Sequence, residues 1–252
     1  MEKIYETLKF TKEGRVATLR LNRPAVLNAY NIQMRDDLWW ALGAINDDPD
    51  ISSVLLMGEG QRAFCSGADL TEFGTSPSQD IARQSRLARD VWSVLRTLSK
   101  PSVAALHGYV IGAGLEMALL CDIRLASTNT IFSLPEVRRG ISPSAGGSQT
   151  LPRILGHPAA LHLMLTGDQI GAQEAMRMGL VHEILSGDEV FGAARAWAHR
   201  LSGMSPNIIG ALKEAVNVGM ELSLSDGLHL ERRLAQQIVA AAAESSGGDL
   251  EH

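Results

Sequence analysis

The chain has few of the features that mark disulfide-built or metal-binding proteins. Only two of its 252 residues are cysteines, Cys65 and Cys121, and neither has a CxxC or histidine spacing. Both lie in apolar segments, which predicts buried, reduced thiols in a cytosol-like compartment. The seven histidines show no metal-ligand spacing either. We therefore expect neither a disulfide framework nor a metal site.

Long apolar runs and an excess of basic charge are also missing. No run approaches the roughly 20 apolar residues of a spanning helix, and the N-terminus, MEKIYETLKF, lacks the apolar core of a signal peptide. The formal net charge is −5, so neither a nucleic acid nor an anionic membrane is expected as a partner. With 45% hydrophobic and 20% charged residues, the composition is typical of a globular domain. We expect a cytoplasmic protein with a substantial core.

Two common catalytic signatures are absent as well. Gly112-Ala113-Gly114 is followed by Met117, so the GxGxxG signature of dinucleotide-binding folds fails. No GxSxG elbow occurs, which argues against an ordinary serine hydrolase.

What the chain does contain is a glycine-rich stretch that ends in a helical pattern, HGYVIGAGLEMALLCD at 107–122. Its glycines permit tight turns and leave backbone N–H groups uncovered by side chains. We expect a helix to start near Gly112, with unsatisfied N–H groups and a partial positive charge at its first turn. That arrangement suits a developing oxyanion. Glu116 then lies where it can act as base or acid on the molecule that carries the oxyanion.

Two further stretches accompany this one. RAFCSGADLTE at 62–72 is a strand end that runs into Ser-Gly-Ala-Asp, and FSLPEVRRGISPSAGG at 132–147 carries a second carboxylate, Glu136. With these motifs the chain resembles the crotonase superfamily, also called the enoyl-CoA hydratase/isomerase family. The resemblance begins at LRLNRP (19–24) and extends through LTGD (165–168) to GLV (179–181), so it covers nearly the whole chain.

The resemblance implies an α/β fold in which ββα units repeat as a right-handed spiral. It implies that residues 1–203 form the core with the active site. Residues 204–249 would form a C-terminal helical region that packs in a homotrimer, usually within a dimer of trimers. Residues 250–252 look like the remainder of an expression tag. Periodicity alone predicts only an α/β fold with parallel strands.

The resemblance also implies site residues, position by position. The oxyanion donors would be the backbone N–H groups of Ala68 and Ala113. Glu116 would chiefly activate water, and Glu136 would chiefly protonate the α carbon. Contacts to the acyl-CoA substrate are expected at Ala25, Val26, Ala63, Ala68, Asp69, Leu70 and Gly112. The family often has a lysine at the position of Ala25 and sometimes at that of Thr71, so charged contacts to coenzyme A are not expected from these two residues.

Each carboxylate also has a simpler interpretation. Glu116 could be a helix-start residue favoured by the helix dipole, and Glu136 could be an exposed loop residue. The motifs around both favour catalysis. Two acids that face one cavity cannot both ionise cheaply, which predicts one protonated donor and one ionised acceptor near neutral pH.

The chain is expected to alternate strands and helices. A helix from Asn31 to about Asn46 would bury Met34, Leu38, Leu42 and Ile45, widened by Trp39 and Trp40. Other helices are expected at 80–99, 152–165, 172–178, 188–201, 205–221 and 225–243, and strands at 4–10, 15–21, 53–57, 103–106, 130–134 and 180–185. Residues 245–249 are expected to be disordered.

These expectations together predict an enoyl-CoA hydratase that adds water across the double bond of a 2-enoyl-CoA thioester, with no metal or redox cofactor. Another enolate reaction of the family is the first alternative: double-bond isomerisation, dehydration of a 3-hydroxyacyl-CoA, or C–C hydrolysis. A non-catalytic or RNA-binding relative is the alternative from a different class. Retention of both glutamates and the acidic net charge favour the hydratase, and salt-dependent binding to RNA would distinguish the last alternative.

Overall fold

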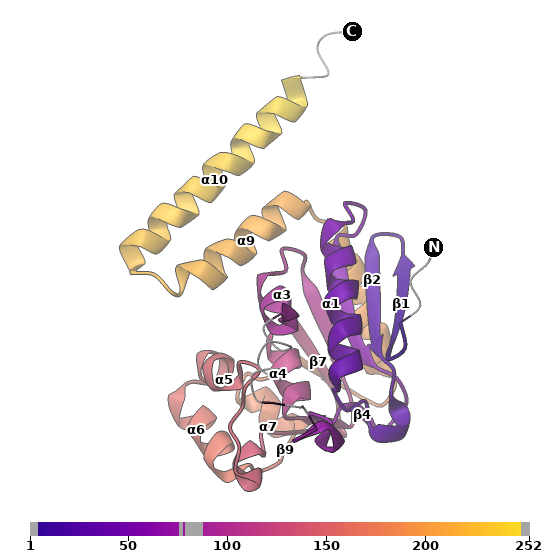
Figure 1. The fold of residues 1–252 in the computed structure, drawn as a ribbon. Helices are drawn as coiled ribbons and strands as arrows, with labels where there is room; N and C mark the ends of the chain where they lie inside the picture. Colours follow the sequence, from indigo (N-terminus) through magenta and orange to yellow (C-terminus); the bar gives the residue numbers. More distant parts are fainter. Residues whose placement is uncertain (1–4, 76–77, 79–87, 248–252) are drawn as a thin grey trace.

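The computed structural model describes residues 5–75, 78 and 88–247, and its centre is a mostly parallel sheet (Figure 1). This larger sheet has six strands in the order β1-β2-β3-β5-β7-β10. β1 pairs with β2 antiparallel, and the other neighbours are parallel. The strands are β1 (Leu8–Glu13), β2 (Val16–Leu21), β3 (Ser53–Gly58), β5 (Ser102–Leu106), β7 (Ile123–Ser127) and β10 (Glu183–Leu185).

A second sheet takes the alternate strands of the chain, in the order β4-β6-β8-β9. Its members are β4 (Ala63–Cys65), β6 (Tyr109–Ile111), β8 (Ile131–Ser133) and β9 (Ile170–Gly171). Each of the successive pairs β3/β4, β5/β6 and β7/β8 therefore places its first strand in the larger sheet and its second strand in the smaller one. This repeat confirms the predicted α/β spiral of ββα units.

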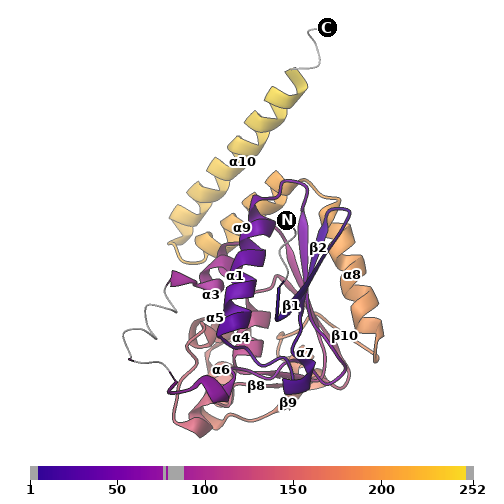
Figure 2. The same cartoon turned by 45° about the vertical axis from the view of Figure 1, so that its right-hand side comes forward.

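Helices cover both faces of the larger sheet. α8 packs against one face through Val190, Ala194 and Ala198, and α1 lies on the opposite side (Figure 2). The helices are α1 (Ile32–Asp47), α3 (Val91–Thr97), α4 (Ala113–Leu119), α5 (Gly147–Leu155), α6 (His157–Thr166), α7 (Ala172–Arg177), α8 (Glu189–Ser202), α9 (Pro206–Gly219) and α10 (Leu224–Gly247). Because α4 lies within the main hydrophobic core, its residues are all buried.

Helix α1 follows the sequence prediction closely. The Asn31 side chain accepts a hydrogen bond from the N–H of Met34, which caps the helix start as expected. The predicted apolar stripe is buried, but Trp40 is 47% exposed and does not extend it. Trp40 projects about 100° further around the helix than Trp39, which carries it out of the buried stripe. Its ring packs edge-on against that of Trp39.

Three other predicted boundaries are wrong. The 80–99 helix is interrupted, because the Asp90 side chain accepts from the N–H of Ser93 and starts a new helix, α3; residues 80–87 lie outside the described part of the chain. The 152–165 helix is two helices, divided at Gly156, which has a φ of 79°. The α10 helix continues to Gly247, where disorder was expected from residue 245, since propagation adds a backbone hydrogen bond for each residue fixed.

Helix α10 projects away from the rest of the molecule, and α9 runs between α10 and the body (Figures 1 and 2). The Lys213 side chain anchors α9 to the body through Asp122 Oδ2, at 2.6 Å, and through the carbonyl of Lys100, at 2.9 Å. Large apolar side chains on α9 remain exposed, including Leu212 and Val216, each at 57%. In the described residues no strand follows Gly203. The domain boundary at residue 203 remains a prediction.

One glycine in α1 is expected to cost stability. Among the described residues, a Cβ added at Gly43 would meet no atom within 4 Å beyond its own turn of α1. Gly43→Ala should therefore raise the free energy of unfolding by about 0.5–1 kcal/mol, because alanine lowers the entropy of the unfolded chain without a clash. Urea denaturation at constant m-value measures this gain, and an unchanged or lower midpoint would contradict it.

Candidate active site

The first element of the site is the loop that leaves β4. The N–H of Tyr30 donates to the carbonyl of Gly67, and the N–H of Asp69 donates to the carbonyl of Tyr30, both at 2.8 Å. Because a trans peptide places its N–H opposite its C=O, the bond to Gly67 turns the N–H of Ala68 away from Tyr30. Among the hydrogen bonds of the described residues, none uses the Ala68 N–H.

The second element is the first turn of α4. Gly112 is the N-cap residue with a φ of 53°, and its carbonyl accepts from the N–H of Glu116 at 2.9 Å. The peptide that joins Gly112 to Ala113 therefore points its C=O into the helix and its N–H out of the helix start. Within residues 5–75, 78 and 88–247, no hydrogen-bond acceptor is recorded for the Ala113 N–H.

Glycines bring these two elements into contact. A Cβ built at Gly67 would lie 3.8 Å from Gly112 Cα, and one built at Gly114 would lie only 2.3 Å from the carbonyl oxygen of Cys65. No side chain larger than hydrogen fits at Gly114 without backbone movement. The amides of Ala68 and Ala113 follow directly on this contact, so the structure brings together the two predicted oxyanion positions.

Glu116 lies beside them in a nearly closed environment, with 3% exposure. Its Oε1 accepts from the N–H groups of Ala145 and Gly147, at 2.9 and 2.8 Å. The Gly147 amide belongs to the start of α5, where a negative charge is favoured. Burial raises the pKa of the Glu116 carboxyl, the two amides oppose that rise, and the charge of Glu136 adds to it.

Glu136 approaches from the other side. Its Oε1 would lie 2.8 Å from a Cβ at Gly112, so the absence of a side chain there gives the carboxyl its place. Its Oε2 is buried and has no hydrogen-bond partner in the described part of the chain. Burial raises the pKa of this carboxyl, and two smaller effects oppose the rise: a hydrogen bond from the residue's own backbone N–H and the charge of Arg139. The two acids thus differ: Glu116 is held by amides that favour its ionised form, and Glu136 has a bare buried oxygen.

Comparison with known proteins identifies this arrangement. The family profile described as enoyl-CoA hydratase/isomerase matches residues 11–249. The chain belongs to the enoyl-CoA hydratase/isomerase family. A probable enoyl-CoA hydratase of Mycobacterium bovis is 38% identical over 243 residues, 96% of this chain and 93% of that protein. The short-chain-enoyl-CoA hydratase of Clostridium acetobutylicum is 36% identical, covering 87% and 84% of the two chains.

A solved structure supports the same assignment. The crystal structure of enoyl-CoA hydratase from Bacillus anthracis superposes with a TM-score of 0.88 at 30% identity, over 93% of this chain and 92% of that one. The family and fold predicted from the sequence are therefore confirmed, and the activity predicted from the sequence is the one for which these relatives are named.

The remaining predicted substrate positions of this family member lie in different environments. Ala25, Val26 and Leu70 are exposed. Ala63 is buried within β4, and its carbonyl accepts from Asn28 Nδ2 at 2.8 Å. Its side chain is therefore not accessible to a ligand.

Asp69 differs from these positions because its carboxylate is engaged within the protein. Its Oδ2 lies 2.9 Å from Arg23 Nη1, and its Oδ1 accepts from both the N–H and the hydroxyl of Thr71. The Thr71 hydroxyl and the Arg23 guanidinium lower the pKa of Asp69. The carboxylate is therefore a structural partner, and contacts to a substrate at this position would use the backbone.

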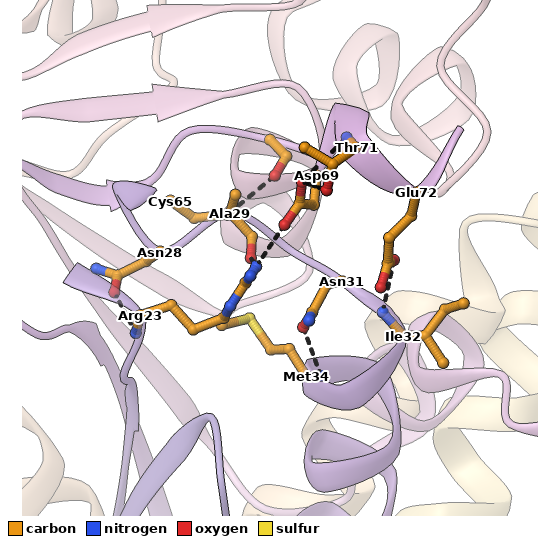
Figure 3. Close-up of polar contacts among 11 residues, drawn as sticks. Arg23, Asn28, Ala29, Asn31, Ile32, Met34, Cys65, Asp69, Thr71 and Glu72 are labelled. Carbon is orange, nitrogen blue, oxygen red and sulfur yellow. Dashed lines mark hydrogen bonds and ion pairs between the residues drawn. The ribbon is translucent and has the colours of Figure 1, made fainter. Parts of the chain in front are cut away.

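Sequence reasoning missed the polar network around Arg23 in this enoyl-CoA hydratase/isomerase chain (Figure 3). Arg23 Nη1 donates to the carbonyl of Ala29 at 2.6 Å as well as to Asp69. Asn28, with a φ of 55°, accepts from the Arg23 N–H and donates to Glu59 and Ala63 carbonyls. The sequence did carry a signal: Arg23 and Asn28 lie on either side of the turn that begins at Pro24, and asparagine tolerates the left-handed backbone conformation.

No helix of the described residues is long and apolar enough to span a membrane. The predicted cytoplasmic location stays a prediction.

Proposed function

We propose that this chain hydrates 2-enoyl-CoA thioesters, with Ala68 and Ala113 as oxyanion donors and Glu116 and Glu136 as base and acid. The observation that carries the proposal is the contrast between the two buried carboxyls. Glu116 Oε1 is held by two amide N–H groups, whereas Glu136 Oε2 has no partner among the described residues. Two carboxyls with raised pKa values beside two free N–H donors match what hydration requires, because the pair can share one proton between a base and an acid.

The proposed reaction has two proton transfers, one from water to Glu116 and one from Glu136 to the substrate. Glu116 accepts a proton from water as the water oxygen bonds to the β carbon. The electrons of the double bond move onto the thioester carbonyl, and the amides of Ala68 and Ala113 stabilise the resulting enolate oxygen. Glu136 then donates its proton to the α carbon, the carbonyl re-forms, and a 3-hydroxyacyl-CoA results. No metal or redox cofactor takes part in this scheme.

The substrate class follows from the surroundings of the site. Exposed apolar side chains follow both catalytic segments, namely Leu70 and Phe73 after Ala68, and Val137 and Ile141 after Glu136. Such side chains suit an acyl chain, and the short-chain relative points to crotonyl-CoA as the first substrate to test. The test is the loss of conjugated enoyl absorbance on adding the purified chain to crotonyl-CoA. Absence of turnover across short, long and branched enoyl-CoAs contradicts the proposal.

The pH dependence of turnover should report the carboxyl pair. Burial raises the pKa of both Glu116 and Glu136 above the ordinary value of 4.5. Catalysis needs one proton on the pair, so kcat/KM should form a bell whose two limbs belong to the pair rather than to either residue. Activity should fall on the acid side as the pair takes up a second proton and on the alkaline side as the pair loses its last proton. A profile that stays flat from about pH 5 to 10 contradicts this assignment.

We further propose self-association through the C-terminal helices as a homotrimer or a dimer of trimers. The support is the exposed apolar surface of α9 and α10, which includes Leu212, Val216 and, at 81% exposure, Leu224; such a surface marks an interface. Light scattering should give three or six times the chain mass of 27.1 kDa. Val216→Asp should reduce that mass by placing a charge on the apolar surface. A monomeric wild-type chain contradicts the proposal.

A further inference from the structure

A continuous series of hydrogen bonds leads from a partly buried arginine to the amide of Ala68. Arg23 Nη1 donates to the carbonyl of Ala29 at 2.6 Å. That carbonyl shares a peptide unit with the N–H of Tyr30, which donates to the carbonyl of Gly67 at 2.8 Å. The Gly67 carbonyl in turn shares a peptide unit with the N–H of Ala68.

We propose that Arg23 is a positioning residue of the oxyanion hole, acting on the Ala68 N–H through these two peptide units. Each unit is planar and trans, so fixing its C=O fixes the direction of its N–H. The Arg23 guanidinium therefore sets the orientation of the Ala29–Tyr30 peptide, and this peptide sets the orientation of the Gly67–Ala68 peptide. This inference rests on the proposed function only for the identity of the ligand.

The positive charge of Arg23 polarises this series of hydrogen bonds as well as fixing its geometry. A cation that binds a carbonyl withdraws electron density from that peptide and makes its N–H a stronger donor, and successive units in a low-dielectric interior reinforce each other. The positive charge lies at the Arg23 end of this series of hydrogen bonds, and the developing negative oxygen lies at the Ala68 end. The sign of the effect favours the enolate over the neutral thioester, which is the selectivity that catalysis needs.

Asp69 limits the effect of Arg23 and holds it in place. Its Oδ2 lies 2.9 Å from the same Nη1 atom, and both side chains are largely buried, with 22% and 12% exposure. Figure 3 shows Arg23 pointing toward both Ala29 and Asp69. A purely structural pair would need both partners equally. A polarising arginine would tolerate neutralisation of Asp69, because Arg23 keeps its bond to the Ala29 carbonyl while the one oxygen of asparagine can still accept from Thr71.

The test compares Arg23→Met with Arg20→Met. Arg20 lies three residues earlier, and among the described residues its side chain forms an ion pair with Glu59, with Nη1 3.6 Å from Oε2. Cinnamoyl-CoA serves as the probe, because its absorption moves to longer wavelength when its carbonyl is hydrogen-bonded and polarised. Arg23→Met should lose most of this shift and lower kcat for crotonyl-CoA by about 10- to 100-fold, with KM within about threefold, since displaced or weakened oxyanion donors act mainly on the transition state. Arg20→Met should match the wild type in both.

A second variant keeps the test decisive if Arg23→Met does not fold. Asp69→Asn should keep the full wavelength shift or increase it, because the arginine charge is no longer compensated. Loss of the shift in Asp69→Asn, or a full shift in a folded Arg23→Met, overturns the inference. A wild-type chain that shifts the probe but turns over no enoyl-CoA refutes the hydratase proposal and leaves this inference standing.

Discussion

Glu136→Gln is expected to lower kcat for crotonyl-CoA hydration by about 10³-fold, equivalent to about 4 kcal/mol of transition-state stabilisation. Glutamine has nearly the shape of a protonated glutamic acid but cannot deliver a proton to the α carbon. Glu116→Gln should have an effect of similar size, because an amide cannot accept the proton of water. Its Oε1 can still accept from Ala145 and Gly147, so the fold should persist. Steady-state kinetics on each single variant measures both losses.

Stability provides an independent check on the Glu136 variant. Burial raises the pKa of Glu136 in the folded state, so its contribution to stability is complete below the ordinary pKa of glutamate and is lost as pH rises through the raised value. Glutamine does not titrate. The melting temperature of Glu136→Gln should therefore rise relative to the wild type as the pH rises above the ordinary pKa of glutamate.

The surface carboxylate of Glu174, on α7, supplies the control. Glu174→Gln should leave kcat unchanged. Wild-type kcat in both Glu116→Gln and Glu136→Gln would show that neither acid is catalytic.

Gly114→Ala is expected to damage the site and the fold together. The added Cβ would lie 2.3 Å from the carbonyl oxygen of Cys65 and 2.7 Å from its Cβ, so β4 and α4 must separate by about 1 Å to reach ordinary contact. Such overpacking costs about 1–3 kcal/mol of stability. Because this contact sets the spacing of the Ala68 and Ala113 amides, kcat should fall by about 10²-fold or more.

Gly43→Ala provides the matched control for that variant. It makes the same chemical change inside α1, where no described atom beyond the same helical turn lies within 4 Å of the new Cβ. It should leave kcat unchanged and raise stability, so the two glycine variants are expected to differ in sign. Thermal unfolding and crotonyl-CoA kinetics on both proteins test the pair. A Gly114→Ala protein with wild-type kcat would mean that the contact between β4 and α4 does not control the donor spacing.

Much of the fold could be predicted because local signals agree with it. The Asn31 cap, the apolar stripe of α1 and the glycine-rich start of α4 each carry their own physical reason in the sequence. The failures occur where one side-chain contact decides a boundary. Asp90 starts a new helix by binding the N–H of Ser93, and Gly156 divides a continuous apolar pattern. The spacing of apolar residues carries no information about such single contacts.

The site could be predicted only in part. Residue type and order indicated Glu116, Glu136 and the two backbone donors. The groups that position these residues are the backbone amides that bind Glu116 and, by our proposal, Arg23. Their roles depend on contacts between segments that are far apart in the sequence. Helix α5 has Gly146 as its N-cap, and no side chain caps this helix start. The amides at this helix start instead hold Glu116.

The most direct test of the account is to incubate the wild-type chain with crotonyl-CoA in H₂¹⁸O and to identify the product by mass spectrometry. The account predicts 3-hydroxybutyryl-CoA with one ¹⁸O on the β carbon and an intact thioester. Release of free coenzyme A, or a shifted double bond without ¹⁸O, would contradict addition of water to the double bond through an enolate stabilised by Ala68 and Ala113.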